Sequence, residues 1–291
     1  MKARRNNKRH IVQAVWTAIS NGYVLGFVQG RIYNGPLKVV CVPGLNCYSC
    51  PGALGSCPIG ALQAELGARK AGLPLYALGF LVAFGSLFGR FVCGFLCPFG
   101  LVQDLLYKIP TKKLGAFKAD KPLRYLKYAV LLVLVILLPA LIRNAAGVGT
   151  PWFCKLVCPA GTLGGGIPLM AMDAQLRAQA GLLFFWKLFV LLALMALSVF
   201  LYRPFCKYLC PLGAFYALFN RLSLYQLRVD KGKCTRCGHC ESVCRMGVAP
   251  QKSPKDGECI RCGDCVKNCP ADAISAGFCA RAQAKSAPNM E

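Results

Sequence analysis

The stretch RFVCGFLCPFGLVQDLL at residues 90–106 reappears, with its cysteines in register, as RPFCKYLCPLGAFYALF at residues 203–219. Each copy has two cysteines four positions apart, the second followed by proline: Cys93 and Cys97, then Cys206 and Cys210. Cysteines at positions i and i+4 face one way at a helix end, and proline suits the start of the next helix. Each pair supplies half of a four-thiolate site, so the repeat predicts that the two pairs meet.

Four apolar stretches surround these motifs, at residues 11–30, 72–89, 128–142 and 181–202. About 20 apolar residues are enough to cross a hydrocarbon core ~30 Å thick. Hydrophobic residues make up 56% of the 291-residue chain, above the roughly 45–50% of ordinary soluble domains. We therefore expect a mainly α, polytopic membrane protein with four transmembrane helices.

The basic residues of the chain are distributed unevenly around these apolar stretches. There are 35 basic and 11 acidic residues, and the basic ones gather before the first stretch, at 108–127 and after the fourth. By the positive-inside rule, we expect a multi-pass protein of the cell membrane with both termini cytoplasmic. No convincing signal-peptide cleavage site follows the first stretch, so we expect it to remain as a helix. The basic residues follow the expected cytoplasmic side of the membrane, and the sequence has no motif that recognises nucleic acid. Nucleic acid is therefore not an expected partner.

The chain is expected to divide into a membrane domain, a small soluble domain and a tail. Residues 1–228 hold two repeats, about 11–110 and 122–220, each with two helices, so the repeats run parallel about an axis along the membrane normal. Residues 229–278 are polar and rich in glycine and cysteine, and predict a cytoplasmic α+β ferredoxin-like domain. Residues 279–291 form the tail, and its Cys279 is expected to be a free thiol.

The soluble domain contains two cysteine runs of identical spacing, CTRCGHCESVC from residue 234 and CIRCGDCVKNCP from residue 259. The spacing C-x2-C-x2-C-x3-C is typical of two [4Fe–4S] clusters in which the fourth cysteine of each run binds the other cluster. One predicted ligand set is Cys234, Cys237, Cys240 and Cys269, and the other is Cys259, Cys262, Cys265 and Cys244. Zinc is the competing interpretation, and complete four-cysteine runs disfavour it. Arg245 replaces the usual proline after the first run.

The membrane domain predicts two further clusters. In the repeat alignment Cys47 matches Cys154, and Cys50 matches Cys158. The expected outer ligands are Cys47, Cys50, Cys154 and Cys158, and the expected inner ligands are Cys93, Cys97, Cys206 and Cys210. Cys41 and Cys57 remain, and a disulfide between them fits an oxidising exterior. Alternatively, one cluster is held within a single loop, by Cys41, Cys47, Cys50 and Cys57.

The two repeated stretches, followed by the double ferredoxin run, resemble NapH-type membrane iron–sulfur proteins, which are quinol-dehydrogenase-like subunits related to the membrane part of NosR. The resemblance implies four transmembrane helices and electron transfer between a quinone pool or a cytoplasmic donor and an external acceptor. It also implies an exported FMN-binding protein as partner. The chain departs from that pattern in Cys154, Cys158 and the cysteine-rich outer loop, which suggests that electrons continue to the outer face through metal.

The expected function is transmembrane electron transfer from a cytoplasmic ferredoxin or flavoprotein to a non-cytoplasmic FMN-binding protein or reductase. Clusters at opposite faces of a ~30 Å core are too far apart for an easy hop, so they must dip into the membrane or be bridged by another cofactor. The chain is expected to be an electron-transfer subunit with no catalytic residue of its own.

Two alternatives stay open. A quinol dehydrogenase would place quinone between helices near Trp16, Arg90 or Tyr202, although such residues are more often interfacial anchors. The other alternative is a non-redox iron–sulfur assembly or regulatory scaffold in the membrane.

Overall fold

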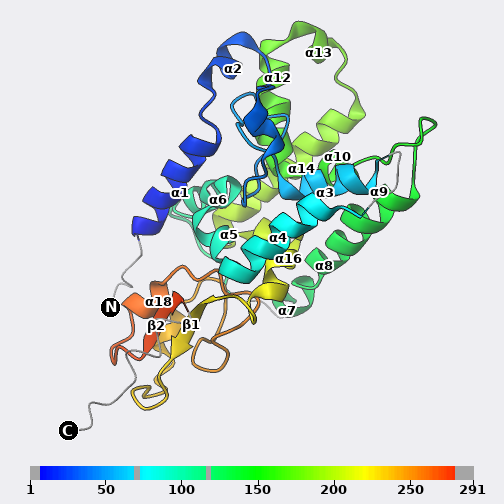
Figure 1. Ribbon diagram of the computed structural model, residues 1–291. Helices are drawn as coiled ribbons and strands as arrows, with labels where there is room; N and C mark the ends of the chain where they lie inside the picture. The colour runs from blue at the N-terminus through cyan, green and yellow to red at the C-terminus, as the bar shows by residue number, and fades with distance from the viewer. Residues whose placement is uncertain (1–6, 69–72, 116–118, 279–291) are drawn as a thin grey trace.

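The computed structural model describes residues 7–68, 73–115 and 119–278, and these are mainly helical. Figure 1 shows a body of helices with a small unit containing β1, β2 and α18 at one end. Helices α2, α12 and α13 lie at the opposite end of that body. The two ends therefore correspond to the expected soluble ferredoxin-like domain and the expected outer loops.

The described residues of the first half form short helical elements: α1 (Asn7–Ser20), α2 (Val24–Gln29), the 3-10 helix η1 (Pro36–Val39), α3 (Pro58–Leu66), α4 (Leu75–Phe88), α5 (Phe91–Phe95) and α6 (Pro98–Leu106). The stretch at 11–30 is not one helix, because the chain turns at Asn21 and Gly22. After the turn, the backbone N–H of Tyr23 donates to the carbonyl of Gly52 at 3.1 Å. The outer loop thus interrupts the first expected span.

Helix α1 presents its apolar side chains outward. Ile11 and Ile19 are 63% and 58% exposed, whereas Arg9 and Gln13 are buried. A soluble protein rarely exposes a long apolar face while burying charge. This inverted pattern is the one expected of a helix that borders lipid.

The second half begins with a helix over Asp120–Leu141. Its segments are α7 (Asp120–Leu123), α8 (Leu126–Val130), the π-helical η2 (Leu131–Leu137) and α9 (Leu138–Leu141). The elements that follow are α10 (Trp152–Leu156), α11 (Pro159–Gly161), the π-helical η3 (Thr162–Gly166), α12 (Ile167–Met172), α13 (Ala174–Ala178), α14 (Leu182–Phe200), α15 (Pro204–Tyr208) and α16 (Pro211–Phe219).

Within the described ranges, two helices are long and apolar enough to cross a membrane, Asp120–Leu141 with 22 residues and Leu182–Phe200 with 19. Helix α4 is apolar but has only 14 residues. The mainly helical fold is confirmed, while the four-span topology stays a prediction.

The last unit is built on a two-stranded antiparallel sheet. Strand β1 (Tyr225–Val229) pairs with β2 (Ile274–Phe278) along its whole length. The short helices α17 (His239–Ser242) and α18 (Asp264–Lys267) lie between the strands in sequence. Because β1 begins before the expected boundary at 229 and pairs with the end of the unit, the strand belongs to this α+β unit.

Candidate iron–sulfur sites

We refer to the cysteine-rich unit at residues 225–278 as the tail unit, or the tail. Its first cysteine group lines one cavity. Its walls include all four members of the first predicted ligand set: Cys234, Cys237, Cys240 and Cys269. Gly238 has φ +74 directly before α17, a left-handed conformation that side chains disfavour. This turn lets the helix begin between the second and third cysteines, so that thiols close in sequence share the cavity with Cys269 from the other run.

The second group lines a separate cavity, again with all four members of its predicted set: Cys244, Cys259, Cys262 and Cys265. Arg245 also lines it, and its guanidinium lies 5.1 Å and 5.4 Å from the ring centres of Tyr107 and Tyr202. Where proline usually follows the cysteine, this chain has a cation that stacks on two tyrosines of the helical body.

The thiols are spread more widely than a single metal ion requires. In the part of the chain that the structure describes, no three His, Cys, Asp or Glu side chains form a group that could hold one ion. Zinc holds its thiolates about 2.3 Å from one centre, whereas the thiolates of a cubane bind four separate iron atoms. Cavities lined by four cysteines suit the donor set of a cubane.

The inner cysteines converge as the repeat predicts, and all four are buried. The pKa of the Cys210 thiol is raised by burial and then by the nearby Cys206, Cys93 and Cys97. Thiols from residues more than a hundred positions apart in sequence therefore lie close together between the two halves.

At this inner site, an arginine from each repeat donates a hydrogen bond to the backbone of a cysteine in the other repeat. Arg90 Nη2 donates to the carbonyl of Cys206 at 3.1 Å, and Arg203 Nη1 donates to the carbonyl of Cys93 at 2.6 Å. Both side chains are fully buried. Nε of Arg90 has no hydrogen-bond partner among the described residues, and a cluster sulfur would accept from it. The inner site therefore fits an iron–sulfur cluster by its donor set and by this orphaned N–H.

A glutamine binds one cysteine of the inner site. Gln103 Nε2 donates to Cys206 Sγ at 3.1 Å, and its Oε1 accepts from the backbone N–H of Phe205 at 3.2 Å. The amide therefore holds the α15 cysteine from the neighbouring helix α6.

The outer site contains the same arrangement. Gln63 Nε2 donates to Cys154 Sγ at 3.3 Å, and its Oε1 accepts from the backbone N–H of Phe153 at 3.1 Å. Gln63 lies six residues after Cys57, in the stretch CPIGALQ, just as the inner glutamine lies six residues after its cysteine in CPFGLVQ. The structural counterpart of Cys97 is therefore Cys57.

The outer thiols gather accordingly. The pKa of Cys158 is raised by burial and then by Cys154, Cys47 and Cys57. A Cβ placed on Gly161 would lie 3.6 Å from Cys47 Sγ and 3.8 Å from Cys158 Sγ. Three of the expected outer ligands thus meet, and Cys57 joins them.

Cys50 differs from the expectation for the outer site. Its Sγ lies 3.7 Å from Oδ1 of Asn21, and it packs against Gly164. The alignment of the first repeat with the second placed Cys50 opposite Cys158, whereas the α3 stretch that begins at Cys57 holds the matching glutamine. Comparing CPIGALQ with CPFGLVQ would have revealed this from the sequence.

Cys41 and Cys57 are both free thiols. The backbone N–H of Cys41 donates to Tyr76 Oη at 3.0 Å, and Cys41 forms a parallel bridge with Ser56. Cys57 is instead the N-cap residue of α3 and lies beside Cys47, Cys154 and Cys158. Its surroundings therefore differ from those of Cys41. The expectation for Cys279 lies outside the described residues.

The tail unit docks directly on the inner site. Glu258, next to Cys259, forms ion pairs with Arg90, 2.6 Å from Nη1 to Oε2, and with Lys127. Burial raises the pKa of Glu258, but the two cations outweigh it and hold that pKa at about 2. A Cβ on Gly94 would lie 2.5 Å from the carbonyl oxygen of Ile260, so backbone meets backbone here.

Two residues expected near a quinone, or as interfacial anchors, are interior. Arg90 forms a hydrogen-bonded ion pair with Glu258, and Tyr202 Oη accepts a hydrogen bond from Arg9 at 3.2 Å. Both side chains are buried, because they fill the junction between the tail unit and the helices. This burial disfavours the interfacial-anchor interpretation for both residues.

Paired ferredoxin-type runs docked against buried C-x3-C-P thiols define an iron–sulfur protein of the electron-transfer class. Models described as 4Fe-4S binding domains match residues 71–116 with 182–229, and residues 256–275. The first model contains the inner cysteines, and the second contains the last cysteine run. No solved structure matches the chain.

Curated relatives narrow this class. The chain is 28% identical over 76% of its length to an uncharacterized protein of Methanocaldococcus jannaschii, covering 86% of that protein. It is 30% identical over 64% to the methylamine utilization ferredoxin-type protein MauN of Methylorubrum extorquens, covering 59%. It is 29% identical over 59% to the ferredoxin-type protein NapH of Haemophilus influenzae, covering 53%. The resemblance to NapH-type iron–sulfur proteins is confirmed, and the chain spans little more than half of the two named relatives.

Proposed function

We propose that the chain carries electrons across a membrane through four iron–sulfur clusters, from a cytoplasmic ferredoxin or flavoprotein to a non-cytoplasmic flavin protein or reductase. The supporting observation is that one inner motif, residues 93–97, is touched from both ends of the molecule. The tail meets it at Gly94, and the outer loop meets it at Cys97. Clusters supply one-electron transfer, and the task of the protein is to hold them in sequence and keep water out.

The outer loop reaches deep into the helical body. A Cβ on Gly44 would lie 2.5 Å from the carbonyl oxygen of Leu96 and 3.0 Å from Cα of Cys97. Tyr216, on α16, donates its hydroxyl to the carbonyl of Pro43 at 3.1 Å. Because the segment just before Cys47 packs on the inner motif, the outer site does not stand a whole membrane thickness away. This contact supports the expectation that the sites dip into the membrane.

Each site has a proposed set of ligands. The tail sets are those expected from the two runs, and the inner set joins the two C-x3-C-P pairs. For the outer set we replace one expected ligand, using Cys57 in place of Cys50. The proposed outer ligands are Cys47, Cys57, Cys154 and Cys158.

The test uses cluster-loaded protein in liposomes that enclose FMN, with orientation checked by protease cleavage of the exposed tail. Ferredoxin reduced beforehand is added outside, on the tail side, and reduction of the enclosed flavin is followed optically. The unmodified protein is expected to reduce the flavin, and Cys206→Ser is expected to abolish reduction while the tail clusters keep their EPR signals. Intact clusters without flavin reduction would contradict the proposal. Reduction by menaquinol alone would favour a quinol dehydrogenase.

Iron content provides an independent measurement. Four cubanes predict about sixteen irons for each chain. About eight irons would leave only the tail clusters and contradict the membrane sites. An unchanged iron content in Cys206→Ala would contradict the inner site specifically.

A further inference from the structure

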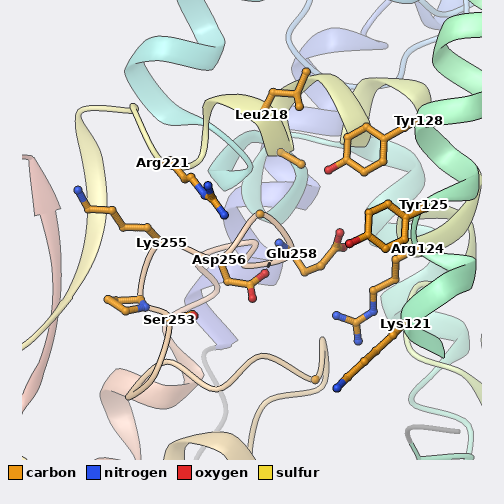
Figure 2. A pocket seen from close by; sticks show the side chains of 14 residues that line it. Lys121, Arg124, Tyr125, Tyr128, Leu218, Arg221, Ser253, Lys255, Asp256 and Glu258 are labelled. Atoms are coloured by element: carbon orange, nitrogen blue, oxygen red, sulfur yellow. Dashed lines mark hydrogen bonds between the residues drawn. The ribbon is translucent and has the colours of Figure 1, made fainter. Parts of the chain in front are cut away.

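A large cavity of about 930 Å³ lies between the start of the Asp120–Leu141 helix, the end of α16 and the loop 253–258. Figure 2 shows this pocket with its basic and aromatic lining. It is separate from the two cavities lined by the tail cysteines. It also lies at the end of the helical body where the tail unit docks, because Glu258 contributes to its wall.

Cations surround this cavity from both sides. Lys121 and Arg124 come from the α7 end, Arg221 follows α16, and Lys255 comes from the tail loop. Figure 2 shows the guanidinium groups of Arg124 and Arg221 pointing toward the middle from opposite walls. Positive charge therefore converges here from parts of the chain that are far apart in sequence.

Of the two acidic side chains that line the pocket, Glu258 is ion-paired with cations of this chain, whereas Asp256 accepts a backbone N–H and keeps its negative charge. Glu258 is paired with Arg90 and Lys127, and Asp256 Oδ1 accepts from the Glu258 backbone N–H at 2.7 Å. Among the described residues, the side chains of Lys121 and Arg221 take part in none of the ion pairs. The pocket thus keeps basic groups available for an anion from outside the chain.

The rim of the pocket is suited to a lipid. Tyr125 is 73% exposed and Leu218 is 57% exposed, and both line the cavity. The pocket opens beside the first turn of a helix that is long and apolar enough to span a membrane. Basic pockets beside transmembrane helices on the cytoplasmic side bind the phosphate head groups of anionic lipids, and tyrosines are enriched at that level.

We propose that this pocket binds the phosphate head group of an anionic phospholipid in the same leaflet as the docked tail unit. Lys121 and Arg221 contact the phosphate from opposite walls, while Tyr125 and Leu218 contact the start of the acyl chains. The bound lipid joins the membrane helix to the loop that carries Glu258, and it thereby stabilises the docked tail. This inference rests on the membrane placement proposed above and not on electron transfer.

The test places cluster-loaded protein in nanodiscs of phosphatidylcholine with a minor fraction of phosphatidylglycerol, and native mass spectrometry counts the lipids retained after release. We expect retained phosphatidylglycerol, and roughly 30-fold weaker retention in the double variant Lys121→Gln, Arg221→Gln. That figure follows from about 1 kcal/mol for each basic side chain at a leaflet surface. The matched control is Lys112→Gln, Lys231→Gln, which removes two exposed lysines outside the pocket and should retain the lipid.

Three results would overturn the inference: equal retention in the pocket variant, equal loss in the control, or displacement of the lipid by inorganic phosphate added to the buffer. The last would identify free phosphate as the ligand. The charge-conserving pair Lys121→Arg, Arg221→Lys should restore retention, which separates loss of charge from misfolding. If the protein enters nanodiscs with intact clusters but shows no lipid preference, this inference fails while the proposed function stands.

Discussion

Arg90 and Glu258 form a buried ion pair, with 2.6 Å between Nη1 and Oε2, across the junction of the helical body and the tail unit. The same arginine donates to the carbonyl of Cys206. Glu258 directly precedes Cys259, a predicted ligand of the second tail cluster. The Arg90 side chain therefore contacts the backbone of Cys206, a predicted inner ligand, and Glu258, the neighbour of a predicted tail ligand.

Removing the charge of Glu258 should weaken this junction. Glu258→Gln leaves two buried cations, Arg90 and Lys127, without their carboxylate, and losing one partner of a buried pair costs about 3–5 kcal/mol. We expect lower thermal stability and faster protease cleavage between the membrane domain and the tail. Glu241→Gln, an exposed change in the same unit, is the control. Equal stability of the two variants would contradict a structural role for the ion pair.

The same carboxylate should make the junction sensitive to acid. Its pKa is about 2 in the folded chain, against an ordinary value of 4.5. A lowered pKa adds stability that is complete above the ordinary value and is lost as the pH falls through the folded value. The difference in unfolding temperature between the wild type and Glu258→Gln should therefore be constant just above pH ~4.5 and should narrow below it. A difference that widened on acidification would have the wrong sign.

The close approach at Gly94 should tolerate no side chain. In Gly94→Ala the new Cβ meets the carbonyl oxygen of Ile260 at 2.5 Å, and such overpacking costs about 1–3 kcal/mol. Because the tail must move away from the inner motif, electron transfer from tail to inner cluster should slow, as measured by freeze-quench EPR. Gly79→Ala, where a Cβ meets nothing within 4 Å, is the matched control and should be neutral or slightly stabilising. Identical kinetics in both variants would show that the route does not pass here.

The two glutamines should act on different clusters. Gln103→Leu removes the amide that donates to Cys206 Sγ, and Gln63→Leu removes the one that donates to Cys154 Sγ. Hydrogen bonds to cluster sulfurs help to set the reduction potential, and because they favour the more negative reduced state, their loss should lower it. Redox-titrated EPR should show one shifted potential in each variant, and each lost hydrogen bond should cost about 1 kcal/mol of stability. If both variants shifted the same signal, the glutamines would not belong to separate sites.

Cys57 and Cys50 should differ in their effect on iron content. Cys57→Ser should lower the iron from about sixteen to about twelve for each chain, through loss of one four-iron cluster. Cys50→Ser should leave it unchanged, because Cys50 contacts Asn21 and Gly164 instead. The reverse result would restore the ligand set expected from the repeat alignment.

The grouping of the tail cysteines could be predicted because most members of each proposed ligand set are close together in sequence. In each run, three cysteines lie within seven residues, and only the crossing partner comes from further away. The two cavities gather those predicted sets. The meeting of the inner cysteines could also be predicted, since both halves carry the same C-x3-C-P motif. The first span was less predictable, because the contact of Tyr23 with Gly52 breaks a helix that composition alone favours.

The sequence by itself determined the cysteine spacing, the paired repeats and the iron–sulfur class, because these depend on residues a few positions apart. The shared pattern of CPIGALQ and CPFGLVQ already indicated Cys57 as the counterpart of Cys97. Only the tertiary structure decided that Cys57 lies with Cys154 and Cys158, and that Glu258 meets Arg90. Cys57 and Cys154 are separated by almost a hundred positions, and Glu258 and Arg90 by 168. Contacts of that kind arise only when packing brings distant helices together, and no local pattern of spacing or hydropathy encodes that Glu258 meets Arg90.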